Sequence, residues 1–89
     1  MALPPLSRLG AALRSLRRRA GLQQQQLAAR AGVTRPMLSN YERGKTIPNV
    51  RTLWRVLDAL GASLADLEDV MGERDSVQRL ARWLLDQYD

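Results

Sequence analysis

Apolar side chains recur every three or four residues along nearly the whole chain, and no segment of any length alternates between apolar and polar residues as a half-buried strand does. In the first such segment, Leu6, Leu9, Leu13 and Leu16 fall on one face of a helix and leave arginines on the other faces. Together with Asn49 as a helix cap and the capping-box spacing of Ser63 and Asp66, these repeats predict helices over residues 6–19, 24–30, 35–43, 50–60, 64–71 and 73–89. The sequence therefore predicts an all-α protein, with a disordered N-terminus over residues 1–5.

Residues 22–48 carry the most informative pattern, because two short helical segments flank a turn at Gly32. Glycine readily adopts the left-handed conformation that ends many helices, whereas a residue with a Cβ is strained there. Thr34 can cap the next helix through its hydroxyl oxygen, and Pro36 lies in the first turn, where its missing N–H is not needed. Two helices joined in this way form a helix-turn-helix, so we expect a module that reads DNA.

The positive charge is concentrated in the half of the chain that holds this motif. Residues 1–45 contain nine lysines and arginines against one acid, Glu42, for a net charge of +8, whereas residues 46–89 contain five against eight, for −3. A phosphate backbone attracts a basic surface and releases counterions on contact, which supplies much of the affinity for nucleic acid. The arginines of the first helix could alone be a solvated face, but beside the turn motif they favour DNA binding.

The composition gives little support to other chemistries. The chain has no Cys, no His and a single Lys, which excludes disulfides, thiolate metal sites and most catalytic nucleophiles and bases. Asp66, Glu68 and Asp69 suit the dipole of a helix start better than a metal site. No apolar run reaches the roughly 20 residues that span a bilayer, and the N-terminus lacks the pattern of a secretory signal. We therefore expect a cytoplasmic protein that is not an enzyme, binds no membrane, and needs no cofactor or metal.

Beyond the turn itself, residues 16–48 resemble the phage repressor and Cro type of helix-turn-helix domain, also called the Xre family. The matching positions are Leu16-Arg17, Gly21-Leu22, Gln24, Leu27-Ala28, Gly32-Val33-Thr34, Glu42-Arg43-Gly44 and Ile47-Pro48, followed by a leucine-rich helix that ends at Leu60-Gly61. The resemblance covers residues 6–72 and implies a compact five-helix bundle that docks its third helix in the major groove, usually as a dimer. Residues 73–89 are unmatched and are expected to form an extra C-terminal helix.

The resemblance also implies roles for individual residues on and around the recognition helix. The base-reading positions are occupied by Arg35, Pro36, Ser39 and Asn40. Arginine pairs with guanine and asparagine with adenine through two hydrogen bonds each, although Arg35 could instead hold a phosphate. The positions that family members use for phosphates are occupied by Gln24, Thr34, Arg43 and Lys45.

Glu42 needs a separate explanation, because it is the only acid in the basic half of the chain. The family pattern implies an ion pair between Glu42 and Arg17 that ties the first helix to the end of the recognition helix. A partly buried pair of this kind fixes geometry more surely than it adds stability. The alternative is an exposed Glu42 bonded to water. The chain departs from the family at Gln23, which replaces the usual Ser or Thr cap of the second helix.

The predicted C-terminal helix carries an apolar surface that is wide enough to need a partner. Its residues are Val77, Leu80, Ala81, Leu84 and Tyr88, and Trp83 and Leu85 broaden it. A second copy of the chain is the favoured partner, because large apolar patches are uncommon on monomers. A two-fold DNA site also needs two recognition helices, which a symmetric dimer supplies. The helix could instead fold back on its own bundle.

Together these features predict a sequence-specific transcriptional regulator that binds double-stranded DNA, most simply a dimeric repressor that occupies an operator. One alternative is an antitoxin that represses its own operon and holds a toxin protein with its last helix. Another is a protein-interaction adaptor whose bundle no longer binds DNA, although the net charge of +8 around the motif argues against it.

Overall fold

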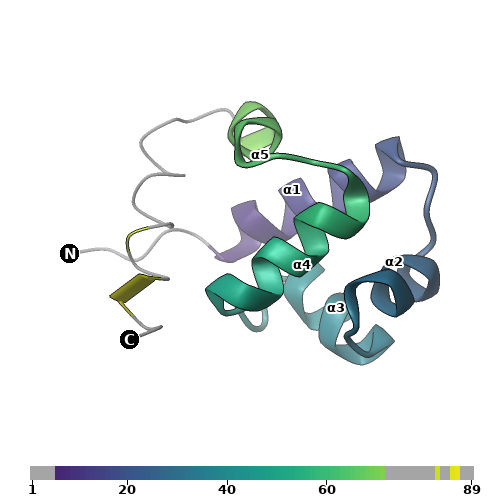
Figure 1. Cartoon of the computed structure of the whole chain (residues 1–89). Helices are drawn as coiled ribbons and strands as arrows, with labels where there is room; N and C mark the ends of the chain where they lie inside the picture. The colour runs from purple at the N-terminus through teal and green to yellow at the C-terminus, as the bar shows by residue number, and fades with distance from the viewer. Residues whose placement is uncertain (1–5, 72–81, 83–84, 87–89) are drawn as a thin grey trace.

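The computed structural model describes residues 6–71, 82, 85 and 86, and this part of the chain contains helices and no strand (Figure 1). The bundle is built from α1 (Leu6–Arg19), α2 (Gln24–Ala31), α3 (Arg35–Glu42), α4 (Val50–Leu60) and α5 (Leu64–Met71). The predicted all-α fold and five-helix bundle are confirmed. The expectations for residues 1–5, for most of the predicted helix over residues 73–89 and for its apolar surface apart from Leu85 lie outside the described residues.

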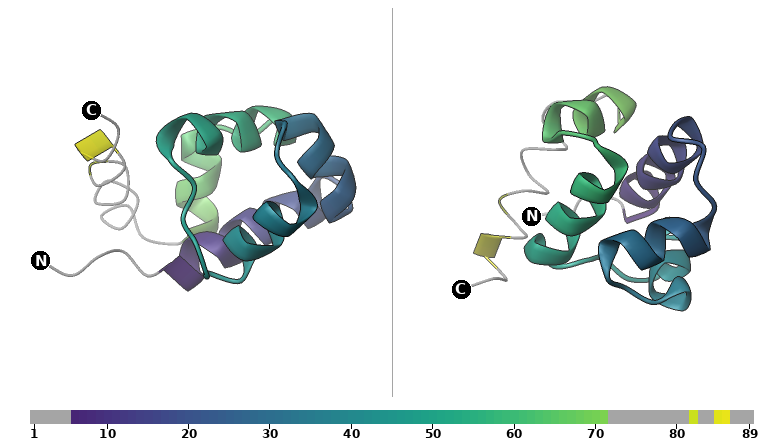
Figure 2. Two further views of the ribbon diagram at one scale, coloured as in Figure 1. Left: turned by 90° about the horizontal axis from the view of Figure 1, so that it is seen from below. Right: turned by 45° about the vertical axis from the view of Figure 1, so that its right-hand side comes forward.

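α1 is the central helix of the bundle. It packs against α3 and α5, while α2 packs against α3 and α4. Figures 1 and 2 show α5 on one side of α1 and α3 on the opposite side. The two helices of the helix-turn-helix, α2 and α3, therefore lie together on the side of the molecule away from α5.

Side-chain caps explain where α3 and α4 begin. The Met37 N–H donates to Thr34 Oγ1 at 3.2 Å, and the Thr52 N–H donates to Asn49 Oδ1 at 2.8 Å. Each bond satisfies an N–H of the first turn that has no partner within the helix. Thr34 and Asn49 are the two caps that the sequence predicted, and α4 has the predicted bounds.

At the starts of α5 and α2, hydrogen bonds join the N-cap residue to the residue three positions later. The Ser63 N–H donates to Asp66 Oδ2 at 2.8 Å, and the Asp66 N–H donates to Ser63 Oγ at 3.1 Å, which is the capping box expected from their spacing. At α2, the Gln23 N–H donates to Gln26 Oε1 at 2.8 Å. The glutamine tract is thus part of a capped helix, even though Gln23 replaces the usual Ser or Thr.

Two helix ends differ from the prediction by one residue. α2 continues to Ala31, because Gly32 adopts the left-handed conformation at φ 72° and the Val33 N–H donates to the Ala28 carbonyl at 3.0 Å. α3 stops at Glu42, and Arg43 is its C-cap at φ −87° and ψ −1°. Shifts of one or two residues are typical of helix ends, and at the end of α3 the cap retains a nearly helical backbone.

Leucines from all five helices form the centre of the core. The fully buried leucines are Leu9, Leu13, Leu27, Leu38, Leu57 and Leu67. Burying one such side chain contributes about 1.5–3 kcal/mol, so each helix is held with its apolar face inward. For α3, this fixes which side faces solvent.

Gly10 allows α1 and α3 to approach closely. A Cβ atom at this position would overlap the backbone carbonyl oxygens of Tyr41 and Glu42. Both carbonyls belong to the last turn of α3, and backbone atoms cannot move aside as a flexible side chain can. The angle of α3 across α1 therefore depends on a glycine for which sequence analysis assigned no role.

The described residues contain neither a membrane span nor a metal cluster. None of their helices is long and apolar enough to cross a membrane. They also contain no group of three or more His, Cys, Asp or Glu side chains that could hold a metal ion. Of the acids considered from the sequence, Asp66 instead caps the start of α5.

Candidate nucleic-acid interface

α3 has one buried face and one face open to solvent. Its buried residues are Leu38, Tyr41 and Glu42. The four base-reading candidates lie on the other face, where Arg35 and Pro36 are exposed and Ser39 and Asn40 are partly exposed. Arg35 and Asn40 are therefore available to a ligand, as a reading helix requires.

A shallow hollow runs along this open face of α3. Its volume is about 340 Å³, and it is lined by Gln24, Arg35, Pro36, Ser39, Asn40 and Arg43. We call it the α3 hollow. It brings all four base-reading candidates together with two of the four phosphate-binding candidates.

A second hollow adjoins the first at the start of α2. It has a volume of about 310 Å³ and is lined by Arg17, Gln23, Gln24, Gln25 and Arg35. Gln24 and Arg35 line both hollows, so the polar surface continues from the reading face of α3 to the N-terminus of α2. The exposed guanidinium of Arg35 beside this helix N-terminus favours an anion such as a phosphate.

The other two phosphate-binding candidates lie outside both hollows. Thr34 and Lys45 are exposed, one at the start of α3 and the other in the loop that follows it. The Thr34 hydroxyl oxygen accepts the Met37 N–H, which leaves its O–H free to donate to a ligand. The candidates thus surround the α3 hollow without all lining it.

Arg17 and Glu42 form a buried ion pair between α1 and α3. Arg17 Nε lies 2.7 Å from Glu42 Oε2, and Arg17 Nη2 lies 2.9 Å from Glu42 Oε1. Arg17 is 9% exposed and Glu42 is 7% exposed. The hydrogen bond to Glu42 raises the pKa of Arg17, against a smaller opposing effect of burial. The pair implied by the resemblance is present, and the exposed Glu42 of the alternative is not observed.

The same carboxylate also binds the side chain of Gln24, which sequence analysis did not anticipate. Gln24 Nε2 donates to Glu42 Oε1 at 3.1 Å, and Arg17 Nη1 donates to the Leu22 carbonyl at 2.9 Å. Glu42 therefore connects α1, α2 and α3 at one buried point. The bond uses one N–H of the Gln24 amide and leaves the second for another acceptor.

Arg43 and Asn40 contact each other on the open face of α3. Arg43 Nη2 donates to Asn40 Oδ1 at 3.0 Å. The guanidinium therefore lies back along α3, within the α3 hollow, and not beside Lys45 in the following loop. Residues three apart on a helix share a face, so their spacing was a signal that could have revealed this contact.

Arg55 is a further residue that sequence analysis missed. From α4, its Nε donates to the Ala31 carbonyl at 3.2 Å and its Nη2 donates to the Gly32 carbonyl at 3.1 Å. These carbonyls end α2, where the helix dipole favours a positive charge. Burial raises the pKa of Tyr41 on α3, and the charge of Arg55 opposes that effect. Arg55 thus braces the turn of the helix-turn-helix from α4.

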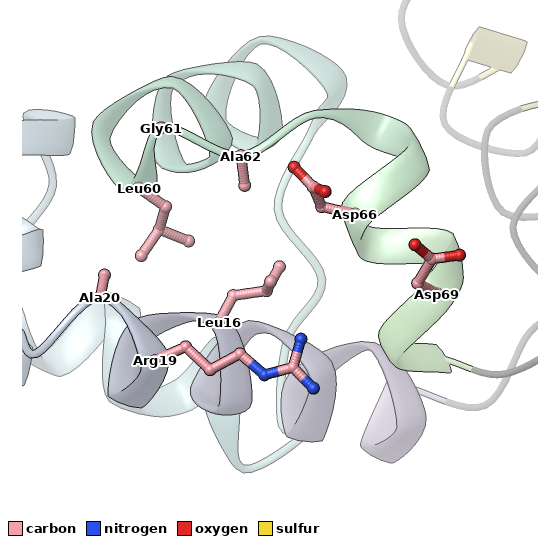
Figure 3. A pocket seen from close by; sticks show the side chains of 8 residues that line it. All are labelled: Leu16, Arg19, Ala20, Leu60, Gly61, Ala62, Asp66 and Asp69. Atoms are coloured by element: carbon pink, nitrogen blue, oxygen red, sulfur yellow. The ribbon is translucent and has the colours of Figure 1, made fainter.

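A third hollow lies apart from this interface, between α1 and the turn that joins α4 to α5 (Figure 3). Its volume is about 300 Å³. Arg19 reaches toward it from α1, and Asp66 and Asp69 reach toward it from α5. None of the base-reading or phosphate-binding candidates lines it, so it is not part of the α3 surface.

The sequence matches a known family and known proteins over most of the described bundle. The sequence model of the helix-turn-helix family matches residues 13–67. The uncharacterized HTH-type transcriptional regulator y4dJ of Sinorhizobium fredii is 41% identical over 59 residues, which are 66% of this chain and 77% of that protein. Two further HTH-type regulators are matched over 50% and 43% of their own length.

Solved structures of regulators share the fold. The clp gene regulator ClgR from Corynebacterium glutamicum superposes with a TM-score of 0.71 and 39% identity, over 75% of this chain and 87% of that one. The restriction-modification controller protein C.AhdI from Aeromonas hydrophila gives a TM-score of 0.67 and 31% identity, over 70% and 94%. These relatives are regulators and not enzymes, as expected for this chain. The protein therefore belongs to the Xre/Cro-type helix-turn-helix family of DNA-binding transcriptional regulators.

Proposed function

We propose that this protein is a dimeric repressor that recognises a two-fold operator by placing α3 in the major groove. The observation that carries the proposal is the α3 hollow, which gathers Arg35, Ser39 and Asn40 on the solvent face of a helix anchored by Leu38. A major groove admits a helix of this kind, and its base edges offer partners for these polar groups.

The chemistry of each side chain supports a particular role in reading bases. Arg35 donates two parallel hydrogen bonds to guanine, and Asn40 exchanges two with adenine. Pro36 has no polar side-chain group and offers apolar contact to a thymine methyl. Ser39 has a short hydroxyl that reaches a base directly or through one water.

The groups around the α3 hollow support contacts to the phosphate backbone. Gln24 stands at the N-terminus of α2 with one amide N–H uncommitted by its bond to Glu42, and helix N-termini favour phosphates. Thr34 offers its O–H at the start of α3, and Lys45 offers a flexible charge in the following loop. The net charge of +8 over residues 1–45 favours binding to any duplex. Contacts to the bases then distinguish one DNA sequence from another.

A dimer accounts for the apolar surface predicted in the C-terminal segment. Leu85, which broadens that surface and is among the described residues, is 61% exposed. Two copies related by a two-fold axis would bury the surface and place two α3 helices on successive major grooves, about 34 Å apart. Occupying an operator in this way represses transcription by excluding the polymerase.

The antitoxin alternative rests on the same C-terminal segment, because that segment would have to hold the toxin protein. No described residue favours a toxin over a second copy of this chain. The adaptor alternative is disfavoured, because the relatives of this chain are transcriptional regulators.

Selection of bound fragments from a random duplex pool, at a fixed low salt concentration, tests the proposal directly. We expect an enriched sequence with two-fold symmetry and half-sites about one helical turn apart. A double variant, Arg35→Ala with Asn40→Ala, should keep its helical circular dichroism and lose the enrichment. Absence of an enriched sequence with the unchanged protein would show that operator recognition is wrong. Sedimentation as a monomer at the concentration that saturates the selected duplex would show that the dimer is wrong.

A further inference from the structure

Arg43 lies among the base-reading candidates and not with the loop that follows α3. It lines the α3 hollow with Arg35, Ser39 and Asn40, whereas Lys45, two residues further on, does not. The side chain of Arg43 is exposed, and its one described bond is the donation from Nη2 to Asn40 Oδ1. The contact holds the guanidinium on the face that the proposed function turns toward the bases.

We propose that Arg43 reads a guanine in the operator, and that Asn40 positions its guanidinium while reading the neighbouring base pair. The inference rests on operator binding through α3. It gives Arg43 a role in sequence specificity, where the family resemblance implied a contact to the phosphate backbone.

The location of Arg43 just beyond α3 does not keep it away from the bases. Eight residues separate it from Arg35, which is about 12 Å along a helix, and base edges are usually reached from the first turns of a recognition helix. Long side chains on a helix lean toward its N-terminus. The bond to Asn40 shows the guanidinium one turn back toward that end, where the other reading groups lie.

The contact leaves both side chains enough hydrogen-bonding capacity to read bases. A guanidinium has five N–H donors, so four remain on Arg43 after the bond to Asn40, and guanine needs two of them. Asn40 keeps a second lone pair on Oδ1 and both N–H groups, which are what adenine requires. Adjacent readers that bond each other can therefore face adjacent base pairs.

Positioning by Asn40 also distinguishes this role from a phosphate contact. A phosphate can be held by the point charge of a lysine as well as by the fork of an arginine, and neither contact carries sequence information. Two bonds to one guanine edge require a fixed guanidinium plane. Fixing that plane before binding reduces the entropy lost when the complex forms.

The test is the same duplex selection, repeated with Arg43→Lys, which keeps the positive charge and removes the planar pair of donors. We expect Arg43→Lys to relax the preference for guanine at one position of each half-site, by roughly 5- to 150-fold, and to leave the other positions unchanged. Lys45→Ala is the control, and it should weaken all duplexes alike. Asn40→Ala should relax two adjacent positions, its own and that of Arg43.

Two results would overturn the assignment while leaving operator binding intact. One is an unchanged set of preferences in Arg43→Lys, which would place Arg43 on a phosphate. The other is relaxation of a single position in Asn40→Ala that differs from the position affected by Arg43→Lys, which would remove the positioning role. If the unchanged protein selects no sequence, operator recognition fails, and base reading by Arg43 fails with it.

Discussion

Glu42 is buried and is not part of the proposed DNA-binding surface, yet its hydrogen bonds hold a residue that is. Its two oxygens accept bonds from Arg17 and from Gln24, and the carboxylate itself faces the interior. The second N–H of Gln24 is oriented by this bond, so Glu42 acts on the phosphate-binding candidate through its amide. A buried carboxylate that accepts three hydrogen bonds fixes the positions of its partners more surely than it stabilises the fold.

We predict that Glu42→Gln lowers the free energy of unfolding by about 3–5 kcal/mol, because the guanidinium of Arg17 stays buried without its counter-charge. Urea denaturation followed by circular dichroism measures the loss. Asp58→Asn is a matched control on the exposed surface of α4 and should change stability by no more than about 0.5 kcal/mol. Equal effects of the two substitutions would contradict a structural role for the buried pair.

Replacing Gly10 by alanine should destabilise the protein, whereas the same change at an ordinary helical glycine stabilises it. Gly→Ala inside a helix usually stabilises by about 0.5–1 kcal/mol. At Gly10 the added Cβ meets backbone carbonyls of α3, so we expect Gly10→Ala to destabilise by about 1–3 kcal/mol. Thermal unfolding compares it with Ser15→Ala, an exposed site on the same helix. A higher melting temperature for Gly10→Ala would show that α1 and α3 do not need this close approach.

At the scale of helices, local signals predicted the bounds well. Thr34, Asn49 and the pair Ser63 and Asp66 form the expected caps, because capping depends on residues within one turn of each other. The apolar repeats likewise depend on neighbours along a single helix. The two helix ends that moved by one residue are both C-termini, with a left-handed cap at Gly32 after α2 and a nearly helical cap at Arg43 after α3.

Contacts between helices were predicted less completely, because no local pattern encodes them. The Arg17–Glu42 pair followed from the family resemblance and not from spacing. The bond from Gln24 to Glu42, the close approach at Gly10 and the brace from Arg55 all depend on how distant segments meet. For the candidate site, the outward face of α3 was predictable from its apolar residues, whereas the direction of the Arg43 side chain was not.

Arg55 joins α4 to the turn between α2 and α3. We predict that Arg55→Ala lowers the free energy of unfolding by about 1–2 kcal/mol, because two carbonyls lose a charged donor at the end of a helix. Arg55→Lys keeps the charge and loses the fork of donors, so its loss should be smaller. Hydrogen exchange should quicken first at the amides of Gly32 and Val33, which hold the turn. Faster exchange spread evenly over the bundle would contradict a local brace.

At the scale of the whole molecule, the charge is divided between two regions. The net charge of +8 over residues 1–45 includes the helix-turn-helix, whereas the acids gather in residues 46–89, for a net of −3. Asp66 and Asp69 lie on α5, across α1 from α3 (Figure 2). If α3 enters the major groove as proposed, this division of charge helps to attract an approaching duplex to the side of α2 and α3 before any base is read.

This division predicts that the position of a charge matters more for binding than the net charge does. Lys45→Ala and Arg19→Ala each remove one positive charge, one beside α3 and the other at the hollow between α1 and α5. If Lys45 holds a phosphate, its loss should reduce the slope of log K against log salt by about 0.9, measured by fluorescence anisotropy with a labelled duplex. Arg19→Ala should leave that slope unchanged, because Arg19 neutralises no phosphate and so releases no counterion from the duplex. Equal slopes for the two variants would mean that the duplex senses only the overall charge, and the interface would then have to be placed elsewhere on the molecule.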